Sequence, residues 1–286
     1  MRNKPRTKSK APSPAKVSKP AVAAPQPSAA GRCDPQSTSL AGRVALVTGS
    51  SKGLGKAMAF ALGAAGAKVA VNYCNGREQA ERTFAEFTAR GWSGGLFRAD
   101  VTRESAVNRL VADIGRKLGP VDIVVVNATP DQPHAPIEEY GWDFHQQMLD
   151  FFVKSPYLLA RAVLPHMKQQ RWGRIVNIGT ENVRLGVPNF SAYCAAKGAQ
   201  AAWSASMARE LAPWAITVNT VCPGWIPVER HENDPQSAKD AYLAGIPMKR
   251  WGIPADVGGI VAFLASEAAS FLTGQDIAVN GGNTVC

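Results

Sequence analysis

The chain has 286 residues, 45% of them hydrophobic and 19% charged, which suffices for one sizeable buried core but not for two full domains. Its formal net charge of +10 is concentrated at one end, because the first 39 residues carry eight basic residues and a single acid. The remaining chain is nearly balanced in charge, which argues against duplex nucleic acid as a partner of the globular part.

Residues 1–39 differ in composition from the rest of the chain. They hold seven of the 20 prolines together with much Ala and Ser, and such a segment buries too little apolar surface to offset its ordering entropy. We therefore predict a disordered basic tail. A transit peptide, an arm for an acidic partner, a translation start placed too far upstream and a solvated tail without specific function remain open readings of it.

Export, membrane insertion and metal binding find no support in the sequence. There is no apolar run of about 20 residues and no secretory signal pattern, so we expect an intracellular, cytoplasmic protein without membrane association. The five cysteines are odd in number and form no CxxC pair, and the four histidines lack metal-ligand spacing. We expect reduced thiols and no structural metal.

From residue 42 onward, short runs rich in Val, Ile and Leu alternate with Ala-rich helical stretches. This alternation predicts an α/β fold: a Rossmann-type, doubly wound parallel sheet of about seven strands with helices on both faces, in a single domain of residues 40–286. The carboxyl ends of such strands meet at one edge, where a ligand binds. The expected strands are 44–48, 68–72, 94–99, 123–127, 174–179, 216–221 and 276–279.

The first expected strand runs into the sequence TGSSKGLGKAMAFALGAAGA, which places Gly49, Gly53 and Gly55 at a strand-to-helix turn. Glycine suits these positions because a Cβ would obstruct both a tight turn and the approach of a pyrophosphate to backbone amides at the helix N-terminus. An ordinary glycine-rich turn is the alternative. The flanking strand and Ala-rich helix favour a dinucleotide site.

The second expected strand and its end, from Lys68 to Gly76, contain no acidic residue. An acid there would hold the ribose 2′-hydroxyl of NAD and repel the 2′-phosphate of NADP. Lys52 in the glycine turn and Arg77 beyond the strand supply cations, although Arg77 also fits a solvent-facing position. The sequence therefore favours NADP(H) over NAD(H).

Tyr193 and Lys197 stand four residues apart in an Ala-rich stretch opened by Ser191, so their side chains are expected on one helical face. A phenol has a pKa of about 10, and lowering it by roughly three units requires about 4 kcal/mol of preferential phenolate stabilisation. A neighbouring ammonium supplies such stabilisation. The alternative is a solvent-facing pair on an ordinary helix.

The ordered motifs TGxxxGxG, YCAAK and VNGG resemble those of the short-chain dehydrogenase/reductase family, especially its 3-oxoacyl-[acyl-carrier-protein] reductase-like members, from about Leu40 to the C-terminus. The resemblance implies hydride transfer between NADP(H) and a carbonyl or secondary alcohol. It assigns proton transfer to Tyr193, assistance to Lys197 and orientation of the substrate oxygen to Thr180. Oligomers are common in this family, so we expect a homodimer or homotetramer.

The resemblance also distributes the cofactor over the fold. Asp100 and Val101 would flank the adenine, Asn127 and Ala128 would line the adenosine side, and Pro223 and Gly224 would shape the nicotinamide pocket. With the glycine turn, the expected cofactor-binding residues are Gly49, Ser51, Lys52, Gly53, Leu54, Gly55, Asp100, Val101, Asn127, Ala128, Tyr193, Lys197, Pro223 and Gly224.

Several positions depart from the family pattern. Phe152 stands where the family places an asparagine that relays protons to the lysine, and Asp150 is the nearest polar substitute. Thr180 replaces the usual serine, and its methyl group restricts χ1 while the hydroxyl donor is retained. Thr129 and Val228 replace a glycine and a hydroxyl residue near the expected cofactor.

Substrate choice is assigned to residues 225–251, which by family analogy form a mobile lid. Their aromatic and charged residues suit acyl thioesters, cyclic ketones or sugars, and 3-oxoacyl substrates rank first by resemblance alone. A dinucleotide-binding sensor or scaffold with little turnover is the alternative function. Such a protein would bind the cofactor but consume none of it.

Overall fold

The structure, a computed structural model, describes residues 38–285, which belong to one compact unit of residues 33–286. The predicted disordered tail of residues 1–39 lies almost entirely outside the described residues. In the described part, seven parallel strands form one sheet in the order β3-β2-β1-β4-β5-β6-β7. The strands are β1 (Val44–Val47), β2 (Lys68–Tyr73), β3 (Gly94–Arg98), β4 (Ile123–Val126), β5 (Gly173–Ile178), β6 (Ile216–Pro223) and β7 (Asp276–Val279).

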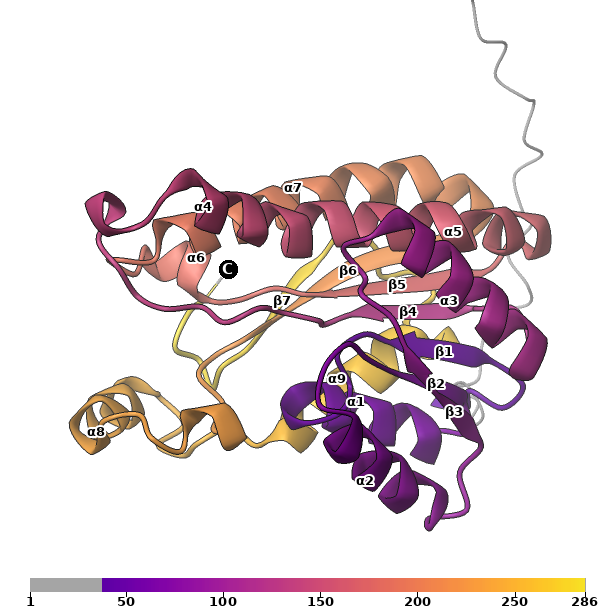
Figure 1. Cartoon of the computed structure of the whole chain (residues 1–286), viewed down its shortest axis with the longest axis horizontal. Helices are drawn as coiled ribbons and strands as arrows, with labels where there is room; N and C mark the ends of the chain where they lie inside the picture. Colours follow the sequence, from indigo (N-terminus) through magenta and orange to yellow (C-terminus); the bar gives the residue numbers. More distant parts are fainter. Residues whose placement is uncertain (1–37, 286) are drawn as a thin grey trace, which may run out of the picture. The chain divides into compact units, whose positions relative to one another are not determined.

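Helices cover both faces of the sheet, as the sequence predicts. α4, α5 and α7 lie along one face and α1, α2 and α9 along the other (Figure 1). α5 continues from α4 through a π-helical segment, Asp150–Lys154. The helices are α1 (Gly53–Ala64), α2 (Arg77–Thr88), α3 (Glu104–Lys117), α4 (Trp142–Leu149), α5 (Ser155–Gln170), α6 (Asn182–Leu185), α7 (Ser191–Leu211), α8 (Gln236–Gly245) and α9 (Pro254–Ala265).

The central strands are apolar throughout because both of their faces are buried. All four residues of β1, VALV, and of β4, IVVV, are inaccessible to solvent, which is the pattern of a parallel sheet covered on two sides. Alternate residues of β1 enter two different cores: Ala45 and Val47 pack toward α1 and α9, whereas Val44 and Leu46 pack toward α3 and α5. The sheet therefore separates two hydrophobic layers within one domain.

The direction of winding reverses between β1 and β4. β1 pairs with β2 on one side and with β4 on the other, so the connections leaving their carboxyl ends diverge. A crevice outside the carboxyl ends at such a reversal is where open α/β sheets bind their ligands. α8 lies at this same end of the molecule, toward the left of Figure 1.

No helix within residues 38–285 is both long enough and apolar enough to span a membrane. The same part of the chain contains no group of three or more His, Cys, Asp or Glu side chains arranged to hold a metal ion.

At the opposite, amino-end edge of the sheet, the buried carboxylate of Asp122 joins three elements. It accepts hydrogen bonds from the backbone nitrogen of Val44 at 2.9 Å and from Nε2 of Gln170 at 2.7 Å. Nε2 of His166 lies 3.2 Å from the same carboxylate. One side chain thereby ties the start of β1 and the end of α5 to the start of β4.

We predict that Asp122→Ala lowers the free energy of unfolding by about 3 kcal/mol, because one buried and two partly buried donors lose a charged acceptor. Urea unfolding followed by circular dichroism measures this loss. Asp113→Ala is the control, since Asp113 pairs with Arg116 on the exposed face of α3 and its loss costs below about 0.5 kcal/mol. Equal losses in the two variants would contradict the prediction.

Candidate active site

The turn after β1 is shaped by glycines at positions where a side chain would either clash or strain the backbone. Gly49 has φ +60°, and a Cβ there would lie 2.8 Å from Cα of Ala128. Gly53 also has a positive φ, of 56°. A Cβ on Gly55 would collide with the carbonyl oxygen of Gly49 and the side-chain amide of Asn127. These contacts account for the glycine spacing that the sequence analysis singled out.

Hydrogen bonds fasten this turn to the end of β4. Nδ2 of Asn127 donates to the carbonyl oxygens of Thr48 and Gly49, at 2.9 and 3.0 Å. Oγ1 of Thr48 accepts from the backbone nitrogens of Asn127 and Ala128, at 2.9 and 3.0 Å. The predicted residues of β1 and β4 are therefore in direct contact. Because both of its donated hydrogen bonds go to backbone of the turn, the Asn127 side chain helps to fix the shape of the turn.

The turn is the N-terminus of α1, where unpaired backbone amides and the helix dipole favour an anion. In the structure that anion is a carboxylate, because the backbone nitrogen of Gly53 donates to Oε1 of Glu229 at 3.5 Å. Glu229 belongs to the segment after β6, which thus reaches across the glycine turn. The sequence analysis did not identify this contact.

The remaining residues of the turn have different environments. Lys52 is exposed at the N-cap of α1, and Leu54 is half-buried against the core. The carbonyl oxygen of Ser51 accepts from Oγ1 of Thr83 at 2.6 Å, which anchors the turn to α2. Lys52 is thus the side chain of the turn that is free to reach a ligand in solvent.

Cations lie around the end of β2, and residues 68–76 include no acid. Arg77 is exposed and pairs with Glu81 at 2.7 Å, so part of its charge is already compensated. Arg98, at the end of β3, donates from Nε to the carbonyl oxygen of Cys74 at 3.1 Å and is also exposed. The sequence analysis missed Arg98 because strand pairing, not sequence proximity, brings it to this edge.

At the end of β3, the carboxylate of Asp100 accepts from the backbone nitrogen and the hydroxyl of Thr102, at 2.9 and 2.6 Å. Val101 is buried in the core on the α3 side. These two predicted adenine neighbours therefore form a fixed corner beside β2.

Tyr193 and Lys197 lie on consecutive turns of α7, and both are buried. Tyr193 is hydrogen-bonded to Thr180, which lies in the loop after β5. Nζ of Lys197 donates to the carbonyl oxygen of Ile178, the last residue of β5. The structure thus brings the three predicted catalytic residues together at the carboxyl end of β5.

Phe152 lies beside both residues of this pair, within the π-helical segment. Its ring packs edge-on against the Tyr193 ring at 5.3 Å between centroids, and Nζ of Lys197 lies 3.8 Å from the Phe152 centroid. The cation therefore faces an aromatic surface where the family pattern provides an amide. Asp150 instead pairs with Lys154 at 3.6 Å, so its carboxylate is engaged away from Lys197.

Burial dominates the electrostatics of the pair. It raises the pKa of Tyr193 to about 12, while the hydrogen bond from Thr180 and the charge of Arg230 lower that pKa. It lowers the pKa of Lys197 to about 7. The expected lowering of the phenol pKa by Lys197 is therefore not produced by the described residues alone. Arg230, in the segment after β6, is a nearby cation that the sequence analysis overlooked.

The other two departures from the family pattern, Thr129 and Val228, lie in different parts of the structure. Thr129 is exposed, and its hydroxyl donates to the carbonyl oxygen of Pro130 at 3.2 Å. Val228 packs against the glycine turn, since a Cβ on Gly53 would meet it at 3.6 Å. Neither side chain disturbs the hydrogen bonds that shape the turn.

Pro223 ends β6, and Gly224 after it donates from its backbone nitrogen to the carbonyl oxygen of Val279 at 3.1 Å. A Cβ on Gly224 would collide with the hydroxyl of Tyr242. That hydroxyl accepts from the backbone nitrogen of Trp225 at 2.7 Å and donates to the buried carboxylate of Glu181. α8 is thereby tied to the loop that carries Thr180.

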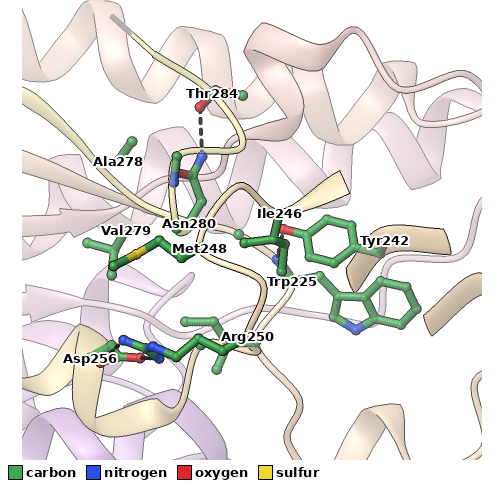
Figure 2. Close-up of a pocket in the computed structure, with 15 residues that line it drawn as sticks. Trp225, Tyr242, Ile246, Met248, Arg250, Asp256, Ala278, Val279, Asn280 and Thr284 are labelled. Atoms are coloured by element: carbon green, nitrogen blue, oxygen red, sulfur yellow. Dashed lines mark hydrogen bonds and ion pairs between the residues drawn. The ribbon is translucent and has the colours of Figure 1, made fainter. Parts of the chain in front are cut away.

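The same carboxylate holds the C-terminal segment. Asn280 and Asn283 donate from Nδ2 to Oε2 of Glu181, at 2.8 and 3.1 Å. Between this segment and the residues after β6 lies a pocket of about 430 Å³ (Figure 2). Tyr242 and Met248 of the expected substrate lid are among its lining side chains.

The buried lysine makes the stability of the protein depend on pH in a defined direction. The pKa of Lys197 is about 7 in the folded chain and 10.5 ordinarily, so between these values the unfolded chain retains a proton that the folded chain releases. Stability therefore rises with pH across this window, by at most about 1.4 kcal/mol per pH unit.

We predict that the free energy of unfolding of the unsubstituted protein increases relative to that of Lys197→Met between about pH 7 and about pH 10. Urea unfolding of the two proteins at matched pH values measures the difference, in which the titration of all other groups cancels to first order. Two curves that stay parallel over this window would show that Lys197 keeps its ordinary pKa.

Comparisons with known proteins place this chain in a family. Residues 49–284 match the protein family described as enoyl-(acyl carrier protein) reductase. The chain is 36% identical over 240 residues to the 3-oxoacyl-[acyl-carrier-protein] reductase FabG of Staphylococcus epidermidis, covering 83% of this chain and 97% of that protein. It is 36% identical over 246 residues to FabG of Pseudomonas aeruginosa, covering 85% and 98%.

A solved structure of a gluconate 5-dehydrogenase from Burkholderia cenocepacia, in complex with NADP and tartrate, is similar with a TM-score of 0.80 and 31% sequence identity. The similarity covers 87% of this chain and 97% of that one. With the seven-stranded parallel sheet and the long family match, these similarities confirm the resemblance read from the motifs. The chain belongs to the short-chain dehydrogenase/reductase family and is an oxidoreductase.

Proposed function

We propose that the protein transfers hydride between NADP(H) and the carbonyl carbon of a small-molecule substrate, or its secondary alcohol in the reverse direction. The observation that carries this proposal is the convergence of Tyr193, Thr180 and Lys197 at the carboxyl end of β5. β5 pairs with β4, whose end is hydrogen-bonded to the glycine turn. A proton donor therefore lies at the same edge of the sheet as the turn proposed to hold a dinucleotide, with only β4 between β1 and β5.

In this proposal each residue acts at a defined atom. The phenolic oxygen of Tyr193 gives its proton to the substrate oxygen during reduction and receives it during oxidation. The hydroxyl of Thr180 orients the same substrate oxygen. Lys197 binds the nicotinamide ribose and places positive charge behind the phenol. The dinucleotide, when bound, supplies or accepts the hydride.

NADP(H) suits the residues around the glycine turn. A pyrophosphate would take the place of the Glu229 carboxylate at the amide of Gly53, since both are anions at a helix N-terminus. Residues 68–76 include no acid, and the exposed cations Lys52 and Arg98, with Arg77 in part, are available to a 2′-phosphate. The similar gluconate 5-dehydrogenase structure contains NADP.

A 3-oxoacyl thioester remains the first-ranked substrate because the FabG relatives are 3-oxoacyl-[acyl-carrier-protein] reductases. The segment of residues 225–251 is the proposed substrate lid, with Trp225, Tyr242 and Trp251 packed ring against ring. A homodimer or homotetramer and a cytoplasmic location also stay predictions.

We predict that Tyr193→Phe lowers the rate constant of carbonyl reduction by about 100-fold to 10,000-fold, because the general acid is removed. The assay follows NADPH absorbance with a panel of 3-oxoacyl thioesters and other ketones. A fluorescence titration with NADPH is expected to show that the variant still binds the dinucleotide, because the glycine turn and Lys197 are retained.

Tyr157→Phe is the matched control, because Tyr157 is an exposed tyrosine of α5 whose hydroxyl accepts from Arg161. Full activity of Tyr193→Phe would overturn the proposed role of the phenol. Tight NADPH binding without consumption across the whole panel would instead favour the sensor or scaffold.

We further predict that Cys74→Asp shifts the preference from NADPH toward NADH by more than about tenfold, because it places a carboxylate at the acid-free end of β2. The ratio of kcat/KM for the two dinucleotides measures the shift. Cys74→Ser, which adds no charge, keeps the original preference. An unchanged ratio in Cys74→Asp would place the 2′-phosphate away from this strand end.

A further inference from the structure

The ammonium of Lys197 has few polar partners. The ring of Phe152 covers one side, at 3.8 Å from Nζ to the ring centroid. Among the described residues, its hydrogen-bond acceptors are the carbonyl oxygen of Ile178 and Oε1 of Gln200, the latter at 3.2 Å. An ammonium has three donors and no acceptor, so Gln200 must turn its amide oxygen toward it.

Gln200 lies on α7 one turn after Lys197 and is only 1% exposed. Its Nε2 has no hydrogen-bond partner among residues 38–285. A buried amide that is only half satisfied opposes folding, and an apolar side chain of similar size would fit such a site at no greater cost. The hydrogen bond to Lys197 is therefore the favourable interaction that the Gln200 side chain makes in this site.

We propose that Gln200 is a positioning residue for the reaction, whose side-chain oxygen keeps Lys197 protonated at the place where Phe152 offers only an aromatic face. This inference rests on the proposed function. It adds a residue outside the Tyr193, Lys197 and Thr180 set, and it names a side-chain polar contact of Lys197 in a chain that has no amide at position 152.

The physical basis is a competition between burial and polar contact. Burial lowers the pKa of Lys197 to about 7, so a modest loss of polar contact leaves the lysine neutral at physiological pH. Cys222 on β6 and Arg230 after β6 also act on its charge, in opposite directions, and Tyr193 faces it on α7 with ring centroid 5.8 Å from Nζ. None of these groups changes when Gln200 is replaced.

The test replaces Gln200 in two opposite senses. Gln200→Met removes the acceptor at similar size, so the alkaline fall of reductase kcat/KM moves to lower pH by about one unit. Gln200→Glu supplies an anion beside the ammonium, so the same fall moves to higher pH. A packing defect would not shift the two variants in opposite directions.

The second readout needs neither cofactor nor substrate. The rise of unfolding free energy with pH, compared with Lys197→Met, begins at lower pH in Gln200→Met and at higher pH in Gln200→Glu. Gln170→Met is the matched control, because Gln170 is a glutamine of α5 whose Nε2 donates to Asp122 at 2.7 Å, at the other edge of the sheet. That control loses stability and leaves both pH curves in place.

If Gln200→Met does not fold, Gln200→Glu carries the test alone, because it retains the size and one oxygen of the original side chain. The inference would be overturned if, in the variants that fold, the pH dependence of kcat/KM and of unfolding free energy matched that of the unsubstituted protein. If Tyr193→Phe lost activity at the same time, the proposed function would stand. If Tyr193→Phe stayed fully active, the proposed function would fail, whatever the Gln200 variants showed.

Discussion

The hydrogen bonds between the ends of β1 and β4 are the constraint on which the rest of the site depends. The side-chain amide of Asn127 holds the carbonyl oxygens of Thr48 and Gly49, while Thr48 holds the amides that follow β4. This fastening is possible only because Gly55 lacks a Cβ that would occupy the same space. The position of the glycine turn therefore depends on β4 as well as on the turn's own sequence.

Burial sets the chemical character of the proposed proton-transfer group, and it acts in opposite directions on its two members. It raises the pKa of Tyr193 and lowers that of Lys197, because the charged form is a phenolate in one case and an ammonium in the other. Both shifts oppose the charged states that the proposed reaction uses. The hydrogen bond from Thr180 acts against the shift at Tyr193, and the contact from Gln200 is the one proposed to act against the shift at Lys197.

The segment after β6 connects the two halves of the site. Glu229 meets the amide of Gly53 at the glycine turn, and Arg230 adds positive charge near the tyrosine. Further along, the Tyr242 hydroxyl reaches Glu181, the residue directly after Thr180. Movement of this segment would therefore change contacts at the glycine turn and near the proposed proton donor together.

The sequence by itself determined the seven strands, the glycine turn and the shared helical face of Tyr193 and Lys197, because strand alternation, turn chemistry and helical periodicity are local properties of the chain. Only the tertiary structure decided which groups surround that pair. Arg230 and the carbonyl oxygen of Ile178 reach it from separate elements, and no local pattern encodes a contact between residues so far apart in the chain, whereas Phe152 is expected near Lys197 from the family resemblance.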